Sequence, residues 1–108
     1  MTTVLDQLQN ISRDLDNAIT ELTDLEMKAA KAESAYRLAK AKAFMQSEGA
    51  VQAREHQAVI ATGIELIERD MTAAMVRVQR EFIKSLHARI DVGRTLVATQ
   101  RVLAGVEI

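Results

Sequence analysis

Residues 8–43 read LQNISRDLDNAITELTDLEMKAAKAESAYRLAKAKA, and this stretch decides the fold. Its apolar residues alternate at spacings of three and four: Leu8, Ile11, Leu15, Ala18, Leu22, Leu25, Ala29, Ala32, Tyr36, Ala39 and Ala43, with Val4 before them. An α-helix has 3.6 residues per turn, so a repeat of 3.5 keeps one narrow seam against a partner helix while the two supercoil. The pattern predicts a coiled-coil-like helix over residues 3–46.

Composition favours an all-α protein and argues against several other classes. The 108 residues include no proline, no cysteine, no tryptophan, one tyrosine and two phenylalanines. Helix formers dominate, and the aromatic residues are too few for a β-sheet core. Without cysteine the chain forms neither disulfide bonds nor thiolate metal sites. No secretory signal is visible and no apolar run approaches the ~20 residues of a membrane span, so we expect a cytoplasmic protein without membrane contact.

A turn is predicted at Ser47-Glu48-Gly49, because glycine just after a periodic segment is a common helix stop. A second helix is predicted over residues 51–103, with Gly63 and Gly93 as candidate kinks. A third helix that begins near Asp91 is the architectural alternative. The expected core face of the second helix comprises Ile60, Ile64, Ile67, Met71, Met75, Val78, Phe82, Leu86, Ile90, Gly93 and Val97, flanked by Val76, Ile83 and Val92. The mean spacing on this face is about 3.7 residues, close to an eleven-residue repeat.

Charge is distributed in alternating blocks, although the net charge is only −1. Residues 1–26 and 46–76 are acidic, whereas residues 27–45 and 77–101 are basic. A reversal near residue 48 places the first acidic block beside the last basic block and disfavours parallel pairing. We therefore predict a single helical domain over residues 1–108, folded as an antiparallel hairpin of two long helices.

Two isolated helices bury too little apolar surface for independent stability. Apolar side chains also lie beyond the seam of the first helix, at Met27, Leu38, Phe44 and Met45. A stripe wider than one seam is typical of a helix with two neighbours. We therefore expect a homo-oligomer, most simply a dimer that forms a helical bundle, with these four residues in a protein interface. A compact three-helix monomer is the alternative use of the same residues.

A row of cations on the second helix suggests a different function. Its members are Arg77, Arg80, Lys84, Arg94 and Arg101. An exposed cationic row could bind the phosphates of a nucleic acid, with an affinity that falls as salt rises. A solvated face is the competing interpretation, because the sequence pI is about 6.1 and no aromatic residue is interleaved to stack on bases.

The sequence offers no catalytic residues and no metal site. His56 and His87 lie far apart, and no second ligand stands at helical spacing from either. No glycine-rich phosphate loop is present. We therefore expect a non-enzymatic protein that needs no cofactor.

Four short segments carry a resemblance: YRLAKAKAF at 36–44, SEG at 47–49, ARE at 53–55 and IDVGRTL at 90–96. Together they resemble small helical-hairpin proteins of bacteriophages and prophages from the early replication and recombination region. The resemblance covers most of the chain and implies a phage accessory protein that acts in the host cytoplasm. It implies no activity for any named residue. We expect an unidentified protein partner, with nucleic acid as the alternative.

Overall fold

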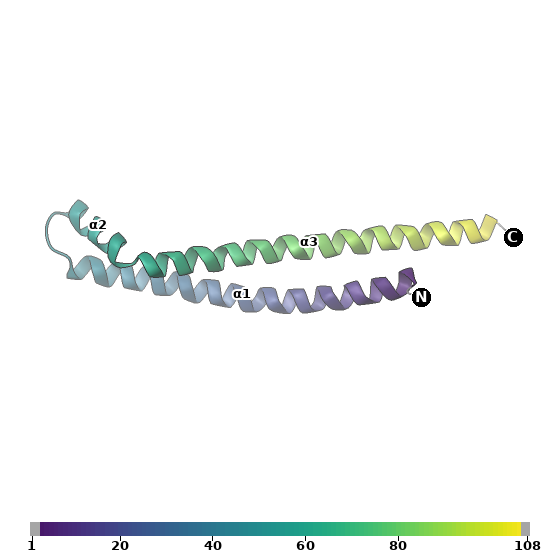
Figure 1. Ribbon diagram of the computed structural model, residues 1–108, viewed down its shortest axis with the longest axis horizontal. Helices are drawn as coiled ribbons and strands as arrows, with labels where there is room; N and C mark the ends of the chain where they lie inside the picture. Colours follow the sequence, from purple (N-terminus) through teal and green to yellow (C-terminus); the bar gives the residue numbers. More distant parts are fainter. Residues whose placement is uncertain (1–2, 107–108) are drawn as a thin grey trace. The chain divides into compact units, whose positions relative to one another are not determined.

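The computed structural model describes residues 3–106, and helices account for nearly all of them (Figure 1). They are α1 (Val4–Gln46), α2 (Val51–Ala61) and α3 (Gly63–Val106). No strand occurs within the described residues, which confirms the all-α class. The helices contribute to two compact units. In one unit α1 up to Leu22 packs with α3 from Val78 onward, and the other unit comprises residues 23–77.

The start of α1 and the turn after it have local causes in the sequence. The backbone N–H of Asp6 donates to Oγ1 of Thr3 at 3.1 Å, and the N–H of Thr3 donates to Oδ2 of Asp6 at 3.2 Å, which is a reciprocal cap. Residues 47–50 are not helical, and Gly49 has a φ of 106°, where a side chain is strained. The Ser47 hydroxyl donates to the carbonyl of Ala43 at 2.6 Å. The chain therefore turns where the sequence predicts.

The seam of α1 is confirmed along its whole length. Every position of the predicted series from Val4 to Ala43 is buried or half-buried. Ala18 is buried in the first unit, and Leu25, Ala32 and Tyr36 are buried in the second. The 3.5-residue repeat of α1 therefore marks its packed face.

Within the first unit α1 and α3 run antiparallel. The side-chain amide of Gln79 donates to the carbonyl of Ala18 at 3.0 Å, and Leu8 lies against Gly93. As the residue number rises along α1 from Leu8 to Ala18, the number of the contacting residue on α3 falls from Gly93 to Gln79. A Cβ atom at position 93 would clash with the Leu8 side chain, so glycine permits the close approach of the helices here.

The predicted core face of the second helix is wrong in its first half. Residues Ile60, Ile64, Ile67, Met71, Met75, Val78 and Phe82 are 47–84% exposed. The prediction is correct further on, because Leu86, Ile90 and Gly93 are buried and Val97 is half-buried. Before Leu86 the positions that face α1 include polar residues, among them Arg69, Thr72 and Gln79.

The inward face of α3 follows a heptad pattern that polar residues conceal. Its positions are Arg69, Thr72, Val76, Gln79, Ile83, Leu86, Ile90, Gly93 and Val97, at alternating spacings of three and four, and each is buried or half-buried. This repeat matches the repeat of α1, as a shared seam requires. Val76 and Ile83 therefore belong to the packed face, although the sequence placed them at its flank. The apolar series of α3 from Ile64 to Phe82 is a second, outward face with a different period.

The second helix predicted over residues 51–103 is divided in the structure. α2 ends at Ala61, and Thr62 follows with φ −112° and ψ 25°. The Thr62 hydroxyl donates to the carbonyl of Ala58 at 2.7 Å, an arrangement that bends helices. α3 then continues through Asp91 and Gly93 without interruption, so the alternative third helix from Asp91 does not form.

Candidate functional site

The outward face of α3 carries a row of large apolar side chains, which we call the outer stripe. It consists of Ile64, Ile67, Met71, Met75, Val78 and Phe82. At 100° per residue these positions fall within about 80° of the helix circumference. Ile64 is 84% exposed, whereas Thr72 beside the stripe is 7% exposed, so the usual distribution of apolar and polar residues is reversed here. A continuous exposed apolar surface typically marks an interaction site.

The packed interior of the second unit explains why so much apolar surface stays outside. Four of its buried residues are small, namely Ala32, Ala58, Thr62 and Thr72. Small residues let two helices approach closely, but they remove little apolar surface from water. Four large apolar side chains of α3 in this unit, Ile64, Ile67, Met71 and Met75, lie on the outer stripe instead. A helix that is apolar on two sides needs two neighbours.

Most of the interface residues predicted on α1 share one exposed face. Met27, Leu38 and Met45 are exposed, and their spacings of eleven and seven residues place them within about 20° on α1. Phe44 is half-buried and lies about 100° away from Met45 around the helix. Three of the four predicted residues therefore share one exposed face of α1, and Phe44 points in a different direction.

One polar cluster joins the two arms of the second unit, and sequence reasoning missed it. The Arg69 guanidinium lies 4.5 Å from the centroid of the Tyr36 ring, and its Nε is 3.6 Å from Oε2 of Glu33. Nη2 of Arg69 also lies 3.0 Å from Oδ1 of Asp70, and this hydrogen bond raises the pKa of Arg69 above its ordinary value. Arg69 therefore remains cationic and serves as a cross-helix contact at a heptad position.

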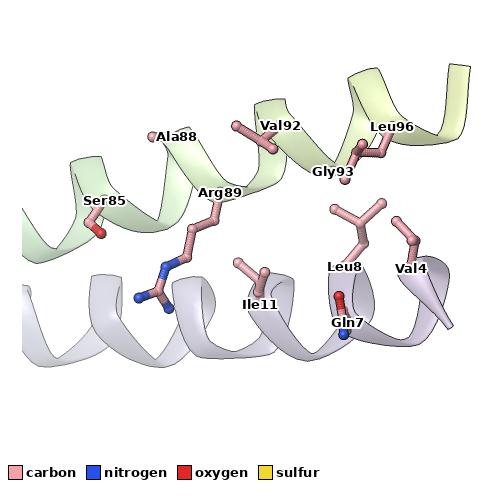
Figure 2. Close-up of a pocket in the computed structure, with 10 residues that line it drawn as sticks. All are labelled: Val4, Gln7, Leu8, Ile11, Ser85, Ala88, Arg89, Val92, Gly93 and Leu96. Carbon is pink, nitrogen blue, oxygen red and sulfur yellow. The ribbon is translucent and has the colours of Figure 1, made fainter. Parts of the chain in front are cut away.

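The first unit has an open groove of about 350 Å³ between α1 and α3. Its lining is Val4, Gln7, Leu8, Ile11, Ser85, Ala88, Arg89, Val92, Gly93 and Leu96. Figure 2 shows Arg89 reaching from α3 toward α1 beside Ile11, and Leu8 facing Gly93. Arg89 is exposed at the edge of the groove. The groove is thus an apolar surface with one cation.

The five cations of the predicted basic row are all exposed. Nζ of Lys84 lies 3.0 Å from Oε1 of Glu81, so part of its charge is locally balanced. On α3 the five positions spread over about 120° of the circumference. They form a broad basic side of the helix and not a single narrow track.

The described residues offer neither a metal site nor a membrane-spanning helix. Within residues 3–106 no group of three or more His, Cys, Asp or Glu side chains could hold a metal ion. None of the helices in this range is both long and apolar enough to cross a membrane. Comparison of the chain with protein-family models, curated proteins and solved structures finds no match. The exposed surfaces are therefore the basis for a functional interpretation.

Proposed function

We propose that this protein acts without catalysis, through helix-mediated self-association and binding of a protein partner. The outer stripe carries the proposal, because its six large side chains are 47–84% exposed. Burial of one such side chain contributes about 1.5–3 kcal/mol, so the exposed fractions together correspond to about 5–11 kcal/mol per copy. Association costs about 4–15 kcal/mol in lost translational and rotational freedom, and full burial of the stripes of two copies is of the same order.

We assign the outer stripe to a dimer contact and the Met27, Leu38 and Met45 face to the protein partner. The two faces lie on different helices, so one need not block the other. Methionine side chains adapt to partners of different shape, which suits a surface that binds another helix. The resemblance to phage accessory proteins supports the host cytoplasm as the proposed setting.

The test of self-association is sedimentation velocity on Ile64→Ser/Ile67→Ser. We expect the double variant to sediment as a monomer at concentrations where the unmodified chain associates, with unchanged helicity by circular dichroism. The matched control is Val102→Ser, which lies on α3 outside the stripe at a 66% exposed position and should leave association unchanged. Equal sedimentation of the double variant and the unmodified chain would remove the stripe from the interface.

The second face is tested by Leu38→Ser/Met45→Ser, because both residues are exposed on it. If it also contributes to self-association, this variant lowers the mass in solution. If it serves the protein partner alone, the mass stays the same and capture of that partner is lost.

A second candidate function is nucleic-acid binding by the basic side of α3. The observation that favours it is the exposure of all five cations, Arg77, Arg80, Lys84, Arg94 and Arg101. Fluorescence anisotropy with single- and double-stranded oligonucleotides should then show binding that weakens as salt rises. Arg80→Glu/Lys84→Glu should abolish it, whereas Lys40→Glu/Lys42→Glu makes the same charge change on α1 and should preserve it. Absence of binding at low salt would make this side a solvated face.

A further inference from the structure

The period of the outer stripe restricts which helix can cover it. Within the stripe, Ile64 and Met75 are eleven residues apart, as are Ile67 and Val78, and Met71 and Phe82. An eleven-residue repeat corresponds to about 3.67 residues per turn, whereas a heptad corresponds to 3.5. A partner that follows the stripe over several turns must share its repeat. The seam of α1 has the heptad repeat, so a second α1 does not match, but a second outer stripe does.

The spacing of the outer stripe is also symmetric. Ile67 and Met75 lie four residues before and after Met71, and Ile64 and Val78 lie seven residues before and after it. A two-fold interface uses the same patch on both subunits, so the patch must be complementary to itself. In an antiparallel pair centred on Met71, the five stripe residues from Ile64 to Val78 of one α3 each face a stripe residue of the other, and Phe82 lies beyond this paired segment.

Charge favours the antiparallel over the parallel orientation. Residues 64–70 of α3 are net acidic, with Glu65, Glu68 and Asp70 against Arg69, and residues 77–84 are net basic, with Arg77, Arg80 and Lys84 against Glu81. A parallel pair would set acidic segment beside acidic segment and basic beside basic. An antiparallel pair sets the net acidic segment of each copy alongside the net basic segment of the other. Attraction between oppositely charged segments of two chains fixes their relative orientation more than it raises their affinity.

We propose that the outer stripe of α3 pairs with that of a second copy of this chain, antiparallel, with the two-fold axis at Met71. The inference rests on the proposed self-association and specifies its partner, direction and register. Each copy keeps its inward heptad face against its own α1. Each α3 therefore packs on two sides: its heptad face contacts α1 of the same chain, and its outer stripe, with the eleven-residue repeat, contacts α3 of the second copy.

Single-cysteine variants test this register, because the chain has no cysteine of its own. In the proposed pair the two copies of residue 71 meet at the axis, so Met71→Cys should form an intermolecular disulfide under mild oxidation. The two copies of residue 64 would lie fourteen residues apart along the helices, or about 21 Å, whereas a disulfide needs Cα atoms within about 7 Å. Ile64→Cys alone and Val78→Cys alone should therefore not cross-link, but an equimolar mixture of the two should.

The readout is the cross-linked fraction on a non-reducing gel, with Val102→Cys as an exposed control outside the stripe and circular dichroism to confirm that each variant is helical. Self-linking of Ile64→Cys and Val78→Cys as readily as Met71→Cys would overturn the antiparallel register in favour of a parallel one. A dimer in which no stripe variant cross-links would overturn the stripe pairing and leave self-association intact. A monomeric unmodified chain would overturn the proposed self-association itself.

Discussion

Replacement of Leu86 by alanine should be among the most damaging single changes in this protein. Leu86 is 1% exposed. The substitution removes three carbon atoms at ~0.8 kcal/mol each, about 2.4 kcal/mol, plus a penalty for the cavity that remains. Only α1 covers this face of α3 in the first unit, so the neighbouring side chains can relax partly into the space. We therefore expect a loss of about 2–3 kcal/mol, near the lower end of the range for such substitutions.

Urea denaturation followed by circular dichroism measures this loss, with Val78→Ala as the matched control on the same helix. Val78 is 69% exposed and belongs to the outer stripe. Val78→Ala should cost less than about 1 kcal/mol in dilute protein and more at concentrations where the stripe is covered. The Leu86→Ala loss should be present at every concentration. If Val78→Ala is as damaging as Leu86→Ala in dilute protein, the assignment of inward and outward faces is refuted.

Three further substitutions have expected outcomes in the same denaturation assay. Gly49→Ala should destabilise by about 1–2 kcal/mol, because the φ of 106° forces a side chain into the left-handed region; unchanged stability would contradict that conformation. Gly63→Ala should stabilise by about 0.5–1 kcal/mol, since a Cβ there meets nothing within 4 Å; a loss would show that the junction needs glycine. Gln79→Glu should cost about 1–3 kcal/mol at neutral pH, because it sets a buried carboxylate against the Ala18 carbonyl, and acid should restore stability by protonating it; equal loss at both pH values would exclude this contact.

The packed face of α1 was predictable because apolar residues occupy all of its heptad positions. The packed face of α3 was not, since Arg69, Thr72 and Gln79 occupy heptad positions there. Each of these polar groups has a partner that makes burial tolerable. The Gln79 amide donates to the Ala18 carbonyl at 3.0 Å, and the Thr72 hydroxyl donates to the Glu68 carbonyl at 2.9 Å. The first of these contacts joins residues 61 positions apart, and a single sequence does not reveal such a pairing.

The polar residues at heptad positions of α3 also concealed the candidate site, because they made the outer stripe resemble the packed face. The outer stripe contains most of the large apolar residues of α3 before Leu86, and a hydrophobic pattern assigns such residues to the core. A change of repeat, from eleven residues before Phe82 to seven after it, is the signal that two faces are present. On α1 the Met27, Leu38 and Met45 face was predictable as a surface, because α1 has a complete heptad seam elsewhere.

The molar mass of the unmodified protein in solution tests most directly whether a second copy covers the outer stripe. Sedimentation equilibrium over a range of concentrations should give twice the chain mass of 12.0 kDa, with dissociation on dilution. A mass of 12.0 kDa at every concentration would contradict the account, because the outer stripe would then remain exposed to water.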